Sequence, residues 1–278
     1  MIDRRTFFSA SLGLAATATL AACDEESNEE STDEELTILT VAASPIPHAK
    51  ILTEFVQPLL AEQGIDLKVS KFTDYVQPNE VVWYNEIDAN YFQHSNYLHN
   101  YNAENNEELV AVAKIHYEPF GIYAGKSNDL TNIADGAEIA IPNDTANEAR
   151  ALLLLQANGI IALSNPEDLS VTPSDIVENP HNVTFREVEA ADTPHVLEDV
   201  DFAAINGNYA LEAGLHSSDA LVLEAAEGAA FEEYANIIAT TPDKKDDERI
   251  AALVAAMQTD DFKTYLEENF GEDVLPAF

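Results

Sequence analysis

The segment Glu138–Leu155, EIAIPNDTANEARALLLL, decides the fold class because a strand runs directly into a helix. Its first four residues form a short, apolar, strand-like run, and residues 146–158 have a helical pattern that Gly159 ends. The polar residues between the two can cap the start of the helix. Strand-to-helix units of this kind indicate an α/β protein.

Arg150 stands about one turn inside this predicted helix, where the helix dipole disfavours a cation. No other arginine occurs between Arg5 and Arg186. Asn147 lies three residues earlier and therefore shares a face with Arg150. Because a guanidinium binds a carboxylate through two parallel hydrogen bonds, the pattern suggests a clamp for an amino acid. An ion pair with one of the many acidic residues is the alternative.

The rest of the chain alternates between the two patterns. We expect strands at residues 36–42, 65–72, 87–91, 109–115, 121–124, 138–141, 183–188, 202–205 and 235–240. We expect helices at residues 49–63, with a kink at Pro58, and at 97–105, 146–158, 193–198, 246–258 and 261–269. This order predicts mostly parallel sheets in two lobes of similar size, with a ligand beyond the carboxyl ends of the strands.

A second candidate region is rich in aromatic and amide side chains. It reads FTDYVQPNEVVWYNEIDANYFQHSNYLHNY, from Phe72 to Tyr101. Phe92, His94 and Tyr97 follow one another closely after a predicted strand. Such side chains can wall an apolar ligand group and also offer polar tips, or they can simply bridge core and surface.

Composition excludes several classes of partner. The 278 residues include 51 acidic and 13 basic side chains, a formal charge of −38. Nucleic acid and anionic lipid headgroups would repel such a surface. The 46% of hydrophobic residues suffice for a core, and the single cysteine excludes an intrachain disulfide framework. The acid excess favours adaptation to high salt, and a moderate acidic bias of the lineage is the alternative.

The N-terminus resembles an export signal with a lipid attachment site. Arg4 and Arg5 precede the apolar residues 7–22, which are too few for a comfortable membrane span and end at Cys23. We expect residues 1–22 to be a lipoprotein signal peptide, Cys23 to carry the lipid, and residues 23–35 to be an acidic disordered tether. The arginine pair also resembles a twin-arginine signal, and a plain cleaved signal is the alternative.

Several motifs together resemble one family. They are DYVQPNE (Asp74–Glu80), IDANYFQH (Ile87–His94), EPFGIY (Glu118–Tyr123), IPNDTANEARALLLLQANGII (Ile141–Ile161), ENP (Glu178–Pro180) and AINGNYA (Ala204–Ala210). From about Leu36 to Asn269 the chain is similar to the methionine-binding lipoproteins, the substrate-binding components of ABC methionine importers. Glu148, Ala149 and Ala124 depart from the family's usual residues.

The resemblance implies a type II periplasmic-binding-protein fold, with two α/β lobes, a hinge and an interlobe ligand cleft. Residues 36–119 and 208–278 would form lobe 1, and residues 120–207 lobe 2. Arg150 would bind the ligand carboxylate with the help of Asn147, and Asn206 would hold the amino or carboxylate end. The side-chain pocket would be lined by Tyr75, Phe92, His94 and Tyr97. Further candidates near these motifs are His116, Tyr117 and Asn208.

The implied function is capture of L-methionine, D-methionine, a methionine dipeptide or another apolar amino acid. The ligand would pass to a membrane permease and its ATPase. The protein would be held at the cell envelope by its lipid, with no cofactor, no metal, no nucleic-acid partner and no enzymatic activity.

Two other functions are open to the sequence. A zinc-binding lipoprotein could use His94, His99 and His116, although no histidine-rich loop occurs. An exported hydrolase is disfavoured because Ser164 and Ser174 lack a G-x-S-x-G context, and neither a GxGxxG nor a P-loop motif is present.

The lipid anchor can be tested by replacing its attachment site. We expect Cys23→Ser to move the protein from the membrane fraction to the soluble fraction, because acyl chains supply about 0.8 kcal/mol per buried CH2. Fractionation of cells expressing either form measures this. A variant that still sediments with membranes would contradict the anchor.

Overall fold

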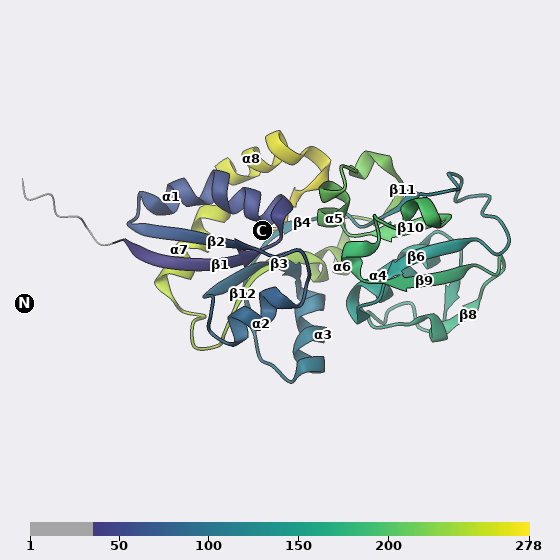
Figure 1. Cartoon of the computed structure of the whole chain (residues 1–278), viewed down its shortest axis with the longest axis horizontal. Coiled ribbons are helices and arrows are strands. Elements are labelled where there is room, and N and C mark those ends of the chain that lie inside the picture. Colours follow the sequence, from purple (N-terminus) through teal and green to yellow (C-terminus); the bar gives the residue numbers. More distant parts are fainter. Residues whose placement is uncertain (1–35) are drawn as a thin grey trace, which may run out of the picture. The chain divides into compact units, whose positions relative to one another are not determined.

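Two β-sheets organise the described part of this computed structural model, which comprises residues 36–278 apart from the side chains of residues 228–230 (Figure 1). The predicted signal peptide, tether and Cys23 lie outside these residues. The larger sheet has the order β13 (Leu275–Pro276), β4 (Val110–Tyr117), β12 (Ala235–Thr240), β3 (Ala89–His94), β1 (Thr37–Ala43) and β2 (Ile65–Lys71). The smaller has the order β11 (Ala220–Leu223), β5 (Gly121–Ala124), β10 (Phe202–Ile205), β6 (Glu138–Pro142) and β9 (Thr184–Val188). A short pair joins β7 (Ala162–Leu163) to β8 (Ile176–Glu178).

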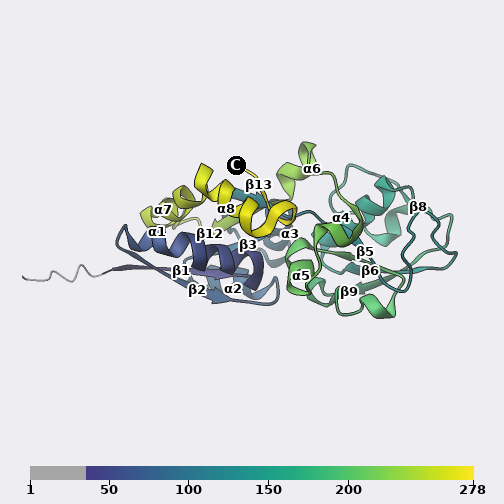
Figure 2. The same ribbon diagram turned by 90° about the horizontal axis from the view of Figure 1, so that it is seen from above.

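Helices pack on the sheets and cap their ends (Figures 1 and 2). They are α1 (Gln57–Ala61), α2 (Gln77–Trp83), α3 (Ser95–Asn105), α4 (Thr145–Ala157), α5 (Gly207–Glu212), α6 (Gly228–Glu233), α7 (Glu248–Met257) and α8 (Asp260–Phe270). Two π-helical turns, Pro45–Ala49 and Leu52–Val56, precede α1, so the predicted helix at residues 49–63 is irregular and Pro58 lies at the start of α1.

Both faces of the six-stranded sheet are buried. Alternate strand residues divide between two apolar clusters: Tyr91 and Ile238 belong to the cluster that includes α7 and α8, whereas Phe92 and Ile237 belong to the cluster that includes α2 and α3. This division follows from the two-residue period of a strand. β3 runs directly into α3, so its carboxyl end lies within the aromatic region predicted from Phe72 to Tyr101.

The five-stranded sheet is covered in the same way. Ile139 and Ile141 pack in a cluster with Leu152 and Leu155 of α4, and Ala140 packs on the opposite face with Tyr209 of α5. The strand-to-helix unit predicted around Arg150 is thus confirmed as β6 and α4. Asp144 caps α4 by accepting the backbone N–H of Asn147 at 2.9 Å.

The sheets are mixed, so the prediction of mostly parallel sheets is wrong. In the larger sheet β1 runs parallel to β2 and β3, whereas β12 is antiparallel to β3 and β4. In the smaller sheet β6 runs parallel to β9 and β10, whereas β5 is antiparallel to β10 and β11. The antiparallel strands β4, β5, β11 and β12 flank the two segments that connect the sheets, which a local strand pattern does not reveal.

These connections define two crossover segments. The first crossover segment, residues 118–120, joins β4 to β5, and the second, residues 224–234, joins β11 to β12. The expected lobe boundary at residue 208 does not coincide with the sheet boundary, because β11 still pairs with β5. The helix expected at residues 193–198 is also wrong: 3-10 turns occur at Ala190–Asp192 and Leu197–Asp199, on either side of Pro194.

Within residues 36–278, no helix combines the length and apolarity needed to cross a membrane. Seven of the basic side chains in this part form ion pairs, among them Lys68 with Asp66 and Lys263 with Asp260. The remaining acidic excess is uncompensated along the surface.

Salt should therefore stabilise the fold. Raising KCl from about 0.1 M to about 2 M shortens the screening length from about 10 Å to a few ångströms and weakens repulsion among surface carboxylates. We expect the melting temperature, measured by circular dichroism, to rise over this range. Sucrose at matched osmolarity controls for solvent exclusion. A melting temperature that falls with KCl would contradict the salt-adapted surface.

Candidate functional site

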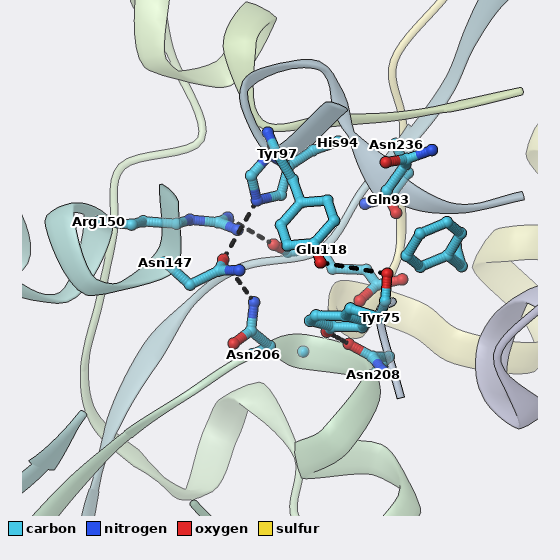
Figure 3. A pocket seen from close by; sticks show the side chains of 12 residues that line it. Tyr75, Gln93, His94, Tyr97, Glu118, Asn147, Arg150, Asn206, Asn208 and Asn236 are labelled. Atoms are coloured by element: carbon cyan, nitrogen blue, oxygen red, sulfur yellow. Dashed lines mark hydrogen bonds between the residues drawn. The ribbon is translucent and has the colours of Figure 1, made fainter. Parts of the chain in front are cut away.

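A pocket is lined by side chains from β3, β12, the first crossover segment, α3, α4, the start of α5 and the loop before α2 (Figure 3). Its lining is mostly polar or aromatic: Tyr75, Phe92, Gln93, His94, Tyr97, Glu118, Asn147, Arg150, Asn206, Gly207, Asn208 and Asn236. Most of these side chains are buried. The cavity volume is only about 10 Å³ in this arrangement, so the pocket is nearly closed and a small metabolite fits only if its walls move apart.

Arg150 brings a positive charge to this pocket from the second turn of α4. Its side chain is only 4% exposed. The guanidinium carbon lies 4.3 Å from the ring centroid of Tyr234 and 5.0 Å from that of Phe120. These aromatic faces hold the flat guanidinium by cation–π contact and restrict its rotation.

An acidic partner occupies two of the three guanidinium nitrogens. Nε donates to Glu224 Oε2 at 2.9 Å, and Nη2 donates to Glu224 Oε1 and to the backbone carbonyl of Glu118, the latter at 3.1 Å. Within residues 36–278, Nη1 makes no hydrogen bond. Arg150 is therefore both a pocket residue and half of an ion pair, and Nη1 is the donor left for a ligand.

A chain of amides gives the pocket a defined polarity. Asn147 Nδ2 donates to both carboxylate oxygens of Asp144, at 2.9 and 3.1 Å. Its Oδ1 consequently faces the other way and meets His94 Nε2 at 3.2 Å and Asn206 Nδ2 at 2.8 Å. The nitrogen of Asn206 is thereby used, and its Oδ1 is buried without a partner among the described residues. A buried amide oxygen in this state favours a donor on the ligand.

His94 is held neutral in this chain. Its Nδ1 accepts the backbone N–H of Tyr97 at 3.1 Å, which leaves the proton on Nε2 to donate to Asn147. Burial lowers the pKa of His94 to about 3, with the nearby charge of Arg150 acting in the same direction. Both ring nitrogens are therefore committed, and His94 contributes shape and orientation to the pocket.

Three aromatic rings form one wall. Tyr75 lies 5.7 Å from Phe92 and 5.5 Å from Tyr97, measured between ring centroids. Tyr97 donates its hydroxyl to the Tyr75 carbonyl at 3.1 Å, and the Tyr75 hydroxyl donates to Asn208 Oδ1. Asn208 Nδ2 is left buried without a partner among the described residues. The wall is thus apolar in its faces, with one amide donor beside it.

Glu118 adds a buried carboxylate to the pocket. Oε1 accepts from His116 Nε2 at 2.8 Å and lies 3.3 Å from His48 Nε2. Burial raises the pKa of Glu118 and lowers the pKa of His116 to about 3. Gly207 permits this approach: a Cβ there would lie 2.7 Å from the Glu118 Cβ, a distance that real side chains do not adopt.

His48, His116 and Glu118 are the sole group of three metal-ligating side chains found among residues 36–278. Three of the four ring nitrogens are paired, because Tyr91 contacts His116 Nδ1, His116 Nε2 donates to Glu118 and His48 Nε2 donates to Asn236 Oδ1 at 2.9 Å; His48 Nδ1 is buried without a partner among the described residues. A neutral imidazole that donates through Nε2 offers no lone pair there to a cation. The histidines named for a zinc site do not form such a group, since His94 is committed to hydrogen bonds and His99 is exposed.

Most of the predicted site residues meet at this pocket: Tyr75, Phe92, His94, Tyr97, Asn147, Arg150, Asn206 and Asn208. His116 and Tyr117 lie behind it, bonded to Glu118 and Glu224 respectively. Sequence reasoning missed four lining residues, Gln93, Glu118, Gly207 and Asn236, although the first three lie in the quoted motifs. Glu224 carried no local signal at all.

The fold and the pocket define a two-lobed substrate-binding protein of the type II periplasmic class. The chain belongs to the NlpA lipoprotein family, which matches residues 39–278. A crystal structure of a lipoprotein from Ruminococcus gnavus is similar, with 48% identity and a TM-score of 0.85 over 87% of this chain and 100% of the other.

Two further relatives carry functional names. The methionine-binding lipoprotein MetQ of Bacillus subtilis is 36% identical over 98% of this chain and 99% of its own length. A nutrient-binding protein from Burkholderia cenocepacia, solved bound to methionine, is 36% identical with a TM-score of 0.81 over 86% of this chain and 100% of the other. The wider family to which these proteins belong is one of substrate-binding components of transporters.

The buried histidines predict an acid-sensitive fold. Burial lowers the pKa of His48 to about 4, and that of His94 and of His116 to about 3, from 6.5. Below pH 6.5 these histidines are protonated in the unfolded chain but remain neutral in the folded protein until the pH reaches their lowered pKa. As the pH decreases through this range, the free energy of unfolding therefore decreases by about 1.4 kcal/mol per pH unit for each such histidine. We expect His94→Gln to reduce this slope, measured by urea unfolding at several pH values.

His99→Gln is the matched control, because His99 is exposed. Comparing slopes between variants removes the common contribution of the many carboxylates. An unchanged slope in His94→Gln would show that His94 is not held neutral in the fold.

Proposed function

We propose that the protein is the substrate-binding component of an ABC importer, anchored by a lipid on Cys23, and that it delivers methionine or a close relative to a membrane permease. The observation that carries this proposal is the buried pocket that joins a guanidinium donor, unpartnered amide atoms and an aromatic wall. The names of the Bacillus and Burkholderia relatives support methionine as the ligand.

In the proposed pose the ligand carboxylate meets Arg150 Nη1. A charge-assisted hydrogen bond in a buried site is among the stronger polar contacts available to a small ligand. Asn208 Nδ2 is a second donor without a partner and would serve the same end. Asn147 was expected to assist the carboxylate, but its nitrogen is turned toward Asp144, so we assign it to orienting Asn206 and His94.

The ligand ammonium would occupy the acceptor side of the pocket. Asn206 Oδ1 is an acceptor without a partner, and Glu118 lines the same cavity with a carboxylate. An ammonium has three donors and no acceptor, so it matches these groups and not the donor side. Of the two roles considered for Asn206, we therefore propose the one at the amine.

The ligand side chain would lie against Tyr75, Phe92 and Tyr97. A thioether is flexible and polarizable and makes favourable contacts with aromatic rings. The pocket needs no nucleophile or cofactor for this task, and we propose that the ligand is bound and released unchanged.

Closure around the ligand would use contacts between the lobes. His94 of β3 meets Asn147 of α4 at 3.2 Å, and Glu104 of α3 accepts from Thr145 of α4 at 2.6 Å. Because the pocket residues are buried in this arrangement, ligand entry requires these contacts to open at the crossover segments. The closed form would be the one presented to the permease.

Binding can be measured with purified protein and a ligand panel. We expect L-methionine to raise the melting temperature and to bind in calorimetry, because a ligand of the folded state stabilises it by mass action. Zinc should produce no shift. Absence of binding by any amino acid or dipeptide would refute the proposed function, and a zinc-specific shift would favour the metal-binding alternative.

The pose is tested by Arg150→Ala. Loss of the buried donor should weaken L-methionine binding by about 2–4 kcal/mol, whereas the fold should persist by circular dichroism. Arg186→Ala is the matched control, since Arg186 pairs with Glu138 outside the pocket. Equal affinity in the two variants would discard the carboxylate assignment.

A further inference from the structure

Glu224 occupies a position that ties the pocket to both connections between the sheets. It is the first residue of the second crossover segment, directly after β11. Its carboxylate accepts from Arg150 through Nε and Nη2, from the Tyr117 hydroxyl at 2.5 Å and from the Phe120 backbone N–H at 3.1 Å. Its own N–H donates to the Phe120 carbonyl at 2.9 Å.

These partners come from separate parts of the fold. Tyr117 ends β4, Phe120 belongs to the first crossover segment, and Arg150 lies on α4. One carboxylate therefore joins the six-stranded sheet, both crossover segments and the helix that carries the ligand donor. A side chain with four accepted hydrogen bonds has little freedom, so it can fix the group that it binds.

We propose that Glu224 is a positioning residue for ligand binding: it holds Arg150 with Nη1 directed at the ligand and couples this donor to the two crossover segments. The inference rests on the proposed function, in which Nη1 binds the ligand carboxylate. Glu224 does not line the ligand pocket, so it acts through Arg150 and not by touching the ligand.

A fixed partner matters because Arg150 lies between two cavities. Besides the ligand pocket, Arg150 lines a groove of about 490 Å³, which it and Glu224 share with Glu167, Glu227 and Glu233. Without Glu224, these carboxylates would compete for the guanidinium and draw it from the pocket. An isolated buried cation would also carry an uncompensated desolvation cost. Glu224 satisfies the charge and selects the orientation.

The geometry also sets how the ligand is held. Glu224 accepts hydrogen bonds from Nε and Nη2, and the Glu118 carbonyl accepts a second one from Nη2. In the proposed pose the ligand carboxylate therefore binds Nη1 alone and not two guanidinium nitrogens at once. Glu224 also neutralises the charge of Arg150, so the pair attracts a zwitterion by directed hydrogen bonds and not by net charge.

The ion pair can be tested without any ligand. Residues 36–278 contain three arginines, Arg150, Arg186 and Arg249, so arginine Nε–H signals in nitrogen-15 NMR are few and assignable by Arg186→Lys and Arg249→Lys. In the full-length protein in detergent, we expect a protected Arg150 Nε–H signal that Glu224→Gln abolishes or shifts. Glu232→Gln is the control, because it removes the same charge from an exposed pair on the same segment. An Arg150 signal unaffected by Glu224→Gln would overturn the proposal.

The positioning role is tested by a double-mutant cycle on L-methionine affinity. We expect Glu224→Gln to weaken binding by about tenfold or more and to have no further effect in an Arg150→Ala background, because non-additivity reports a shared action. Glu232→Gln should leave affinity unchanged. Additive losses would indicate a merely structural role, and tighter binding in Glu224→Gln would identify Glu224 as a competitor of the ligand.

These outcomes are separable from the fate of the proposed function. If the wild-type protein binds no L-methionine, the proposed function fails at that step, and the NMR experiment still decides whether Glu224 orients Arg150. If the wild type binds and the cycle is additive, the function stands and the positioning role is refuted.

Discussion

The buried positive charge of Arg150 is the constraint on which the rest of the site depends. A guanidinium that is only 4% exposed must be compensated, and an arginine cannot escape by losing its proton. Glu224, the Glu118 carbonyl and two aromatic faces compensate it from one side. The uncompensated remainder, Nη1, is what the pocket can offer to an anionic group.

The polarity of the remaining lining follows from a second fixed charge. Asp144 sits at the start of α4, where the helix dipole favours a carboxylate. Because it can only accept hydrogen bonds, it determines which way the Asn147 amide is turned, and Asn147 in turn determines Asn206. The cap residue Asp144 thereby determines, through the amides of Asn147 and Asn206, that Asn206 Oδ1 is the free acceptor. The first two turns of α4 thus supply both the donor end and, indirectly, the acceptor end of the pocket.

The hydrophobic periods and cap residues of the sequence predicted several strands and helix α4 correctly. Strands β5, β10 and β12 begin and end at the predicted residues, and α4 lies within a residue of its predicted bounds. Helix α2 was not predicted because Pro78 and polar residues obscure its period, and Pro194 divides residues 193–198 into 3-10 turns. Strand direction and sheet order depend on long-range pairing, which no local period encodes.

The residues of the candidate site also differ in whether the local sequence could predict them. Arg150 was recognisable because a cation is unusual near a helix N-terminus, and the aromatic wall because its members are close in sequence. The resemblance to a known family supplied Asn206 and Asn208. Glu224 lies 74 residues from Arg150 and is one of 51 acidic residues, so composition hides it. Only the fold, by bringing both crossover segments together, distinguishes this carboxylate from the others.

The same acidity explains why a dedicated counter-ion is needed inside the protein. A chain with a formal charge of −38 offers many carboxylates to any mobile guanidinium, and salt screens exposed pairs far more than buried ones. An arginine held only by the ligand would be captured by the acidic groove when the pocket is empty. Pairing Arg150 with Glu224, whose side chain is only 12% exposed, gives the guanidinium one fixed counter-ion in place of many competing ones. The large negative charge of the chain is therefore the physical reason why the buried arginine has its own carboxylate partner.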